Sequence, residues 1–396
     1  MSGPLDGIRI VDLSVAITGP LAAGMLVDQG ADCVKVEQAP TGDVVRWLGS
    51  TVAGISAMFQ TANRGKRSIV LDLRQADGLA ILRDLVADAD VLVQNFRPGV
   101  AERLGVAYDD IRSIRPDIVY ADLTGFGTSG PYSHRRVYDT VIQAQSGLAA
   151  SQTGLNDEQP KFLRQLVCDK VTAYTACQAI TAALLARERG AGGQHVEVPM
   201  LDATLFFFWS DAMVDLTMVG DGVTPGLTLA EVYRLTECLD GKIIYFAAST
   251  AHIHGVSRAV GHPEWCEDPR YDLDGFVEDP QNLLDYGQMT AEAFASMSVA
   301  DALAGLLEGD VPSGPILEKE EVLVDPQVVH NGSIVTWEHP EAGTVRQARP
   351  ASRFSETPVE MRLRASAKGQ DSDEILTGIG RTDEEIRALR AGGVVA

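Results

Sequence analysis

The 396-residue chain has few cysteines, fewer basic than acidic side chains, and no long apolar run without a charge. Its five cysteines are widely spaced and include no C-x-x-C pair, which argues against a disulfide framework or a zinc site and indicates reduced thiols in a cytoplasmic protein. With 33 Lys and Arg against 55 Asp and Glu, the net charge of −22 argues against binding nucleic acid or an anionic membrane through bulk charge.

Signals for export or membrane insertion are also missing. The first residues have neither a basic segment nor an apolar segment of the kind found in signal peptides. The most apolar long stretch, residues 200–219, contains Asp202, Asp211 and Asp215, which are too costly in lipid for a spanning helix. We expect a buried or interface helix there. With 45% hydrophobic and 22% charged residues, the composition is that of a globular protein of two or three domains.

Apolar strand-like runs alternate with helix-like segments through the first half of the chain. This alternation predicts an α/β fold with a mostly parallel, doubly wound sheet. The expected strands are residues 8–13, 33–37, 68–73, 91–94, 118–123 and 194–198, and the expected helices are residues 19–30, 76–87 and 169–190.

The pattern changes from about residue 225. Two short β-like runs in residues 225–248 precede an acidic, helical stretch over residues 257–307, and β segments follow at 334–337 and 345–348. The tail, residues 371–389, is expected to be helical, with a helix start at Thr382 and Glu385. We predict a large domain over residues 1–200, a linker helix over 201–224, a small α+β domain over 225–328, and a return segment over 329–396 that completes the large domain.

Two short motifs have weak functional interpretations. The glycines from Gly125 to Gly130 match G-x-G-x-x-G after a strand, but Pro131 and a polar stretch follow where a dinucleotide fold needs a helix. We expect a tight loop beside a ligand. His252 and His254 alternate on a possible strand near His262, yet no ligand spacing is completed, so surface histidines are favoured over a metal site.

Basic residues recur where the predicted strands begin and end. In open α/β sheets ligands bind at the carboxyl ends of the strands, so such cations would suit a phosphorylated ligand, while scattered surface arginines remain an equal alternative. Residues 1–140 have 14 Lys and Arg against 17 Asp and Glu, whereas residues 201–350 have 7 against 25. The basic residues concerned are Arg64, Lys66, Arg67, Arg74, Arg97, Arg103, Arg135 and Arg136.

Asp169 stands at the start of an expected helix. Its simplest role is that of an N-cap, where the helix dipole and backbone N–H groups favour the ionised carboxylate. A carboxylate kept ionised is a competent nucleophile toward an activated acyl group.

An ordered set of motifs across nearly the whole chain resembles the family III CoA-transferases, a superfamily that also contains the α-methylacyl-CoA racemases. The motifs are PLDGIRIVDL at residues 4–13, GP at 19–20, DCVKVE at 32–37, NRGKRS at 63–68, LDLR at 71–74, NFRPG at 95–99, GFG at 125–127 with GP at 130–131, DKVT at 169–172 and EEIRALR at 384–390.

This resemblance implies a Rossmann-like large domain, an interlocked homodimer, acyl-CoA and carboxylic acid substrates, and no metal. Asp169 matches the catalytic aspartate. The implied substrate positions are Ile17, Thr18, Tyr138 and Asp139. The implied CoA-binding positions are Leu71, Asp72, Leu73, Arg74, Asn95, Phe96, Arg97, Arg103, Arg136, Val137, Tyr138 and Asp139.

The expected reaction transfers CoA through an aspartyl anhydride and an aspartyl-CoA thioester. A racemase is the main alternative, but that branch has a His-Asp pair where this chain has Tyr138-Asp139, and tyrosine is a poor base at neutral pH. A non-catalytic acyl-CoA-binding protein is a further alternative. Ile17 stands where formyl-CoA transferases have a glutamine, and Gln38 replaces an arginine that commonly contacts CoA in the family. We expect the phosphate contact at Gln38 either to be weaker or to be supplied by Arg64 or Arg67.

Overall fold

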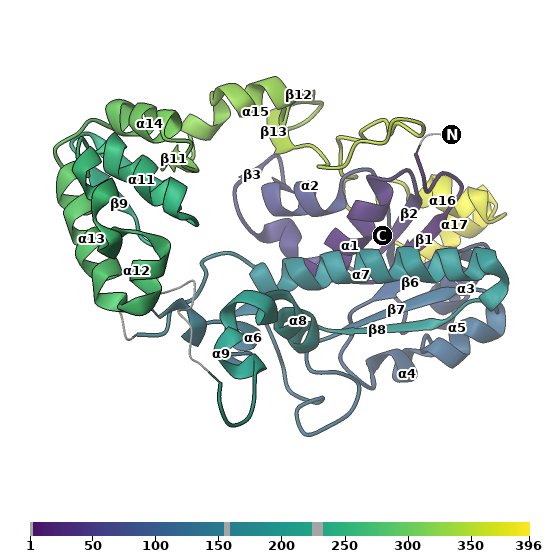
Figure 1. The fold of residues 1–396 in the computed structure, drawn as a ribbon. Helices are drawn as coiled ribbons and strands as arrows, with labels where there is room; N and C mark the ends of the chain where they lie inside the picture. The colour runs from purple at the N-terminus through teal and green to yellow at the C-terminus, as the bar shows by residue number, and fades with distance from the viewer. Residues whose placement is uncertain (1–2, 154–158, 224–232) are drawn as a thin grey trace. The chain divides into compact units, whose positions relative to one another are not determined.

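A computed structural model describes residues 3–153, 159–223 and 233–396 (Figure 1). The contacts within the chain divide it into two compact units. Unit 1 comprises Met1–Ala230 and Gly332–Ala396, and unit 2 comprises Glu231–Asn331. The domain boundary expected at residue 225 lies outside the described residues.

Unit 1 is built on a six-stranded parallel sheet, as the alternating pattern predicts. Its strand order is β5-β2-β1-β6-β7-β8, so the chain moves outward in one direction from β1 and later in the other direction from β6. All six expected strands are present, with shifts of at most two residues at their ends. They are β1 (Arg9–Asp12), β2 (Asp32–Gln38), β5 (Arg67–Leu71), β6 (Val91–Gln94), β7 (Val119–Thr124) and β8 (His195–Pro199).

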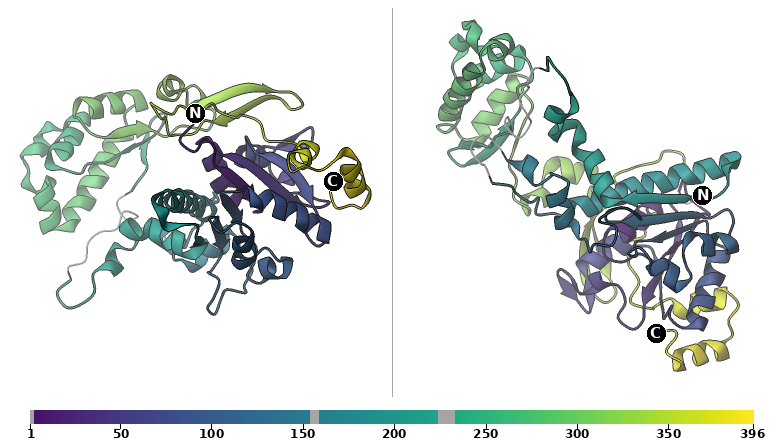
Figure 2. Two further views of the ribbon diagram at one scale, coloured as in Figure 1. Left: turned by 90° about the vertical axis from the view of Figure 1, so that its right-hand side faces the viewer. Right: turned by 90° about the horizontal axis from the view of Figure 1, so that it is seen from below.

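Apolar side chains alternate between the two faces of this sheet and form two cores. On one face, Val11 and Ile69 pack with residues of the third and fifth helices and the C-terminal helices. On the other face, Ile10 and Cys33 pack with residues of the first and seventh helices. The helices on the two faces of the sheet can be followed in Figures 1 and 2. The helices of unit 1 are α1 (Thr18–Val27), α2 (Ala57–Asn63), α3 (Ala76–Ala87), α4 (Val100–Leu104), α5 (Tyr108–Ile114), α6 (Asp139–Gln145), α7 (Val167–Ala186), α8 (Met200–Ala212), α9 (Val214–Thr217), α16 (Ser372–Gly378) and α17 (Asp383–Ala391).

The C-terminal segment of the chain contacts strand β5. Ser68 N donates to Asp371 Oδ2 at 2.7 Å, and Leu71 forms a β-bridge with Val395. Helix α17 begins with the capping box expected at Thr382 and Glu385. Among the described residues of unit 1, the remaining strands form two antiparallel hairpins. They are β12 (Ile334–His339) with β13 (Gly343–Ala348), both expected from the sequence as β segments, and β3 (Thr51–Val52) with β4 (Ile55–Ser56).

Unit 2 packs helices on a small antiparallel sheet around its own apolar core. One expectation for this unit is wrong, because His252 and His254 lie on a helix and not on a strand. The elements of unit 2 are β9 (Thr236–Cys238), β10 (Gly241–Tyr245), β11 (Ser313–Pro315), α11 (Thr250–Ala259), α12 (Leu273–Glu278), α13 (Pro280–Phe294), α14 (Val299–Glu308) and α15 (Pro326–Asn331).

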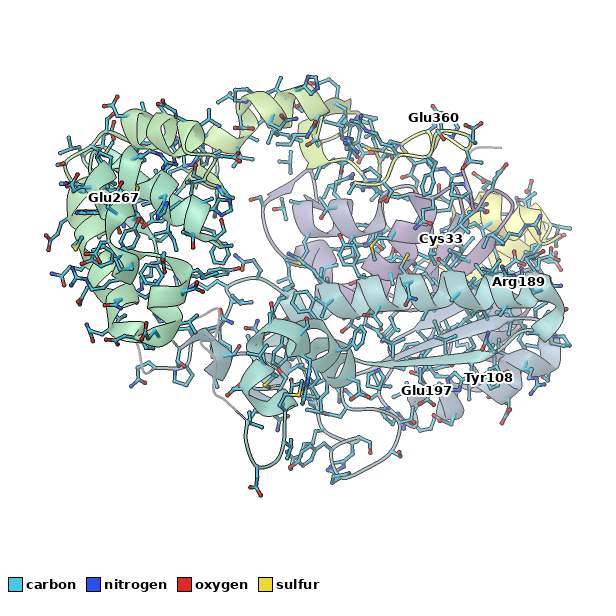
Figure 3. All side chains as sticks on the ribbon, in the orientation of Figure 1. Cys33, Tyr108, Arg189, Glu197, Glu267 and Glu360 are labelled. Atoms are coloured by element: carbon cyan, nitrogen blue, oxygen red, sulfur yellow. The ribbon has the colours of Figure 1, made fainter. Side chains whose placement is uncertain are left out.

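The described helices include none with the length and apolar character needed to cross a bilayer. Helix α8 buries Phe208 but exposes Phe206 and Phe207, so its apolar residues extend beyond a single face. All five cysteines are free thiols. Cys33, labelled in Figure 3, is fully buried, and burial raises the pKa of its thiol to about 12.

Candidate active site

The candidate site forms around the loops that leave the carboxyl ends of β1 and β6. These two strands are neighbours in the sheet, and the order of strand addition reverses between them. Such a reversal opens a crevice at the carboxyl edge of a doubly wound sheet, which is the usual ligand position in this architecture.

Asp169 lies in the first turn of α7, and the expectation that it is the N-cap is wrong. The helix starts at Val167 and Leu166 occupies the N-cap position without a side-chain cap. The Asp169 backbone N–H instead donates to Oδ2 of Asp139 at 3.1 Å. Asp139 therefore satisfies one of the amide groups that a helix start leaves without an intrahelical partner.

The Asp169 carboxylate is partly buried and is held on one side only. Its Oδ1 accepts a hydrogen bond from the Thr18 hydroxyl. Within the ranges that the structure describes, Oδ2 accepts no hydrogen bond. One carboxylate oxygen thus fixes the orientation of the group, while the other is available to react.

Burial raises the pKa of the Asp169 carboxyl, the Thr18 hydrogen bond lowers it, and the negative charge of Asp139 raises it, with a net upward shift. The expectation that the helix start favours the ionised form of Asp169 is therefore wrong. The physical reason is that the Asp169 carboxyl is largely buried, and the loss of hydration penalises its charged form.

Asp139 begins helix α6 and is itself fully enclosed, with 2% of its surface exposed. Its Oδ1 accepts from Gln143 Nε2 at 2.5 Å, and the same amide nitrogen reaches the carbonyls of Leu163 and Gln165 at 3.1 and 3.3 Å. Gln143 therefore connects Asp139 to the segment before α7 through hydrogen bonds. Asp139 in turn bonds the backbone of Asp169.

Cys168 precedes Asp169 but is not a competing nucleophile. It is fully buried, and burial raises the pKa of its thiol to about 12. The thiolate, which is the reactive form, is therefore scarce at neutral pH.

The other predicted substrate residues differ in exposure. Thr18 is the first residue of α1 and contacts Asp169 directly. Ile17 is buried in an apolar cluster with Val45 and Phe59, so its side chain belongs to the core. Tyr138 is 78% exposed and lies next to Asp139 at the start of α6.

Several predicted CoA-binding residues meet in one pocket of about 500 Å³. Leu73 and Arg74, which follow β5, line it together with Arg103 of α4. Arg74 is bound to Asp72 through Nε at 2.8 Å and Nη2 at 3.0 Å, and the hydrogen bonds from Arg74 lower the pKa of Asp72 to about 2. Leu71 is buried in the core.

The remaining predicted CoA positions have varied surroundings. Asn95 contacts the backbone of Val15, and Phe96 packs partly against the sheet core. Arg97 and Arg103 are exposed, and neither forms an ion pair with a residue that the structure describes. Arg136 is exposed as well.

Val137 packs against Gly125 so closely that a Cβ at Gly125 would lie 2.1 Å from Val137 Cγ1. No helix starts directly after the motif of Gly125 to Gly130. The next helix is α6, which begins only at Asp139, in agreement with the preference for a loop over a dinucleotide fold.

Three of the basic residues that suggested a phosphorylated ligand have partners within the protein. Arg64 pairs with Asp28 at 2.6 Å, and Arg67 pairs with Asp32 at 2.6 Å. Lys66 is buried. A CoA phosphate at either arginine would therefore have to share the guanidinium with an aspartate.

A buried set of ion-paired charges was not singled out from the sequence as a group, although Lys66 was. It consists of Asp12, Lys35, Asp43 and Lys66, each at most 3% exposed, with ion pairs of 2.9 Å for Lys35–Asp43 and 2.8 Å for Lys66–Asp12. The sequence feature that could have indicated these buried charges is Lys35, a charged residue between the buried valines of a parallel strand. No group of three or more potential metal ligands occurs among residues 3–153, 159–223 and 233–396.

Comparison with known proteins gives one consistent result. The family described as CoA-transferase family III matches residues 5–372. The chain is 32% identical to succinyl-CoA:glutarate CoA-transferase of Mus musculus over 99% of this chain and 90% of that protein. It is 32% identical to formyl-CoA:oxalate CoA-transferase of Streptomyces avermitilis over 100% of both. A crystal structure of a CAIB/BAIF family protein from Brucella suis matches with a TM-score of 0.81 and 30% identity, over 96% of this chain and 100% of that one.

Proposed function

Because the chain belongs to CoA-transferase family III, an enzyme family, we propose that it moves CoA from an acyl-CoA thioester to a carboxylic acid through covalent intermediates on Asp169. The observation that carries this mechanism is the state of the Asp169 carboxylate. One oxygen is oriented by Thr18, while the other has no hydrogen-bond partner among the described residues.

The raised pKa of Asp169 also fits this role. A carboxylate of higher basicity is a stronger nucleophile than an ordinary aspartate, provided that it is ionised at the working pH. Partial burial further reduces its hydration, so less water must be displaced when it attacks.

The first half of the reaction loads CoA onto the protein. Oδ2 of Asp169 attacks the thioester carbonyl of the donor, the C–S bond breaks, and CoA leaves as a thiolate with the bond electrons. This step leaves an anhydride between the acyl group and Asp169. The thiolate then attacks Cγ of Asp169, the bond between Cγ and the bridging oxygen of the anhydride breaks, and the first carboxylate departs with that oxygen, leaving an aspartyl-CoA thioester.

The second half is the same sequence in reverse. The carboxylate of the acceptor attacks Cγ of the aspartyl thioester and releases the CoA thiolate, which attacks the acyl carbon of the new anhydride. The new acyl-CoA leaves and the Asp169 carboxylate is regenerated. Every step exchanges one activated acyl bond for another, so the free energy of the thioester is kept and ATP is not required.

CoA is a polyanion, and arginine side chains that could bind its phosphates line the pocket after β5. Arg103 lines this pocket, and the exposed Arg97 follows β6 without an ion-pair partner among the described residues. Arg74 also lines it, although it must share its guanidinium with Asp72. We assign the phosphates of CoA to these arginines, since guanidinium groups bind phosphate through paired hydrogen bonds.

The names of the similar proteins suggest dicarboxylates as acceptors. One is named for glutarate and the other for oxalate, and both are dicarboxylates. Ile17 stands where formyl-CoA transferases have glutamine and is buried, so the formyl-CoA and oxalate pair is the less favoured of the two. We further propose that the chain works as an interlocked homodimer.

An exchange assay tests the reaction. Purified protein is incubated with succinyl-CoA and a panel of carboxylic acids including glutarate and oxalate, and mass spectrometry detects new CoA esters. We expect at least one new ester with the native chain and none with Asp169→Asn. Loss of an α-proton into deuterated water without a new ester would identify a racemase instead. Binding of CoA without either reaction would identify a binding protein.

A further inference from the structure

Residues 14–17, called loop 14–17 below, lie between β1 and α1, and side chains from other elements bind their backbone. Asn95, at the end of β6, makes two of these bonds to a single residue. Its Oδ1 accepts from Val15 N at 2.9 Å, and its Nδ2 donates to Val15 O at 2.8 Å. The amide thus pairs with Val15 as a neighbouring strand would, and it connects the ends of β1 and β6 where the sheet order reverses.

The residues on either side of Val15 are held in the same way. Lys35 Nζ donates to Ser14 O at 2.8 Å, and Ala16 N donates to Oδ1 of Asp43 at 3.1 Å. Ala16 has a φ of 65°, a left-handed conformation that is unfavourable for an alanine without external support. The shape of loop 14–17 is therefore imposed by its partners and is not the intrinsic preference of its sequence.

The conformation of loop 14–17 determines the position of Thr18. Ile17 is buried in the core, and Thr18 begins α1. Gly19 lies so close to Ser14 that an added Cβ would be 2.2 Å from Ser14 Cβ. The first turn of α1 therefore has little room to shift relative to loop 14–17, and the Thr18 hydroxyl that bonds Asp169 is placed by that loop.

We propose that Asn95 is a positioning residue, whose two hydrogen bonds to Val15 hold loop 14–17 in the conformation that keeps the Thr18 hydroxyl on Asp169. The proposal rests on Asp169 as the nucleophile of the proposed function. It assigns Asn95 a role different from the CoA contact that the family resemblance implies, since the Asn95 carbonyl oxygen and one of its amide hydrogens are already used by Val15.

A double-mutant cycle tests this role with Asn95→Ala and Thr18→Val. Asn95→Ala removes both bonds without adding charge, and Thr18→Val removes the hydroxyl while keeping the side-chain shape. We expect each single variant to lower kcat about tenfold or more, because an oriented nucleophile loses its alignment. Because both changes act on one contact, the double variant should be close to Thr18→Val alone.

Binding of CoA itself, measured by calorimetry, separates positioning from CoA contact. Asn95→Ala should bind CoA within about twofold of the native protein. Asn282→Ala is the matched control, because the Asn282 amide also donates to a backbone carbonyl, that of Gly275 at 3.0 Å, but in unit 2. It should leave kcat unchanged.

Two results would overturn the proposal. One is a double variant whose kcat falls by the product of the single effects, and the other is weaker CoA binding by Asn95→Ala with kcat unchanged. If Asn95→Ala does not fold, Asn95→Asp retains the acceptor for Val15 N–H, and the cycle is measured on the high-pH plateau, where its added charge does not alter the ionisation of Asp169. Failure of the nucleophile assignment is distinguished by Asp169→Asn, which would then keep its exchange activity.

Discussion

Thr18 and Asp169 are 151 positions apart in the chain, yet the Thr18 hydroxyl donates a hydrogen bond to Oδ1 of Asp169. The contact joins the first turn of α1 to the first turn of α7, two helices on the same face of the parallel sheet. It gives the candidate nucleophile a fixed orientation, and it opposes the effects of burial and of Asp139 on the ionisation of that carboxylate.

The pH dependence of catalysis should follow from the neighbours of Asp169. Its folded pKa is raised, so the reactive carboxylate is lost as the pH falls through that raised value. Asp139→Asn removes a negative charge while keeping an oxygen that accepts from the Asp169 N–H. The acidic limb of kcat/KM should therefore move to lower pH. The variant Thr18→Val should move it to higher pH, and a shift of both variants in one direction would contradict this account.

Loss of the buried Lys66 should destabilise the protein strongly. Its Nζ uses all three donors, on Asp12 Oδ2 at 2.8 Å, Pro20 O at 2.7 Å and Asn63 Oδ1 at 2.9 Å. Lys66→Met leaves the Asp12 carboxylate buried beside Lys35 alone, and we expect a loss of about 3–5 kcal/mol in the free energy of unfolding. Denaturant unfolding measures it.

Arg67→Met is the matched control, because it removes the cation next in the chain from half-exposed ion pairs with Asp32 and Glu374. Its cost should be below about 1 kcal/mol. Equal losses for the two variants would show that burial does not set the cost.

The pocket after β5 should control affinity for CoA and not the chemical step. Arg103→Ala should raise KM for acyl-CoA about tenfold, an effect that weakens at high salt, with little change in kcat. Arg112 of α5 is an exposed arginine that does not line this pocket, so Arg112→Ala is the control and should leave KM unchanged. Steady-state kinetics at two ionic strengths checks both, and a fall in kcat alone would refute the assignment.

The glycine motif after β7 should matter through close packing. In Gly125→Ala the new Cβ would lie 2.1 Å from Val137 Cγ1, which forces Val137 and the adjoining start of α6 to move. We expect a destabilisation of about 1–3 kcal/mol together with lower activity, because Asp139 lies two residues after Val137. The double variant Gly125→Ala/Val137→Ala should recover stability in thermal unfolding. No recovery would mean that the backbone of Gly125, and not its contact with Val137, is the sensitive feature.

The parallel sheet was predictable because each of its strands is a compact apolar run bounded by polar residues, and α3 was predicted to its exact ends. The helix containing Asp169 was also predictable, but its chemistry was not. An aspartate before an apolar face has the same pattern whether it caps the helix or, as here, lies in the first turn with Asp139 in the capping role.

The least predictable feature was which partner each charged side chain contacts. Arg64 and Arg103 look alike in the sequence, yet one pairs with Asp28 and the other faces a pocket. Which partner each charge meets depends on contacts between distant segments, and spacing along the chain does not encode them.

The most direct test of the central claim is the mass of the Asp169 peptide after brief mixing with an acyl-CoA donor, acid quenching and proteolysis. The account predicts a CoA adduct on that peptide which hydroxylamine removes and which Asp169→Asn cannot form. CoA transfer at the native rate by Asp169→Asn, with an unmodified peptide in both proteins, would contradict it.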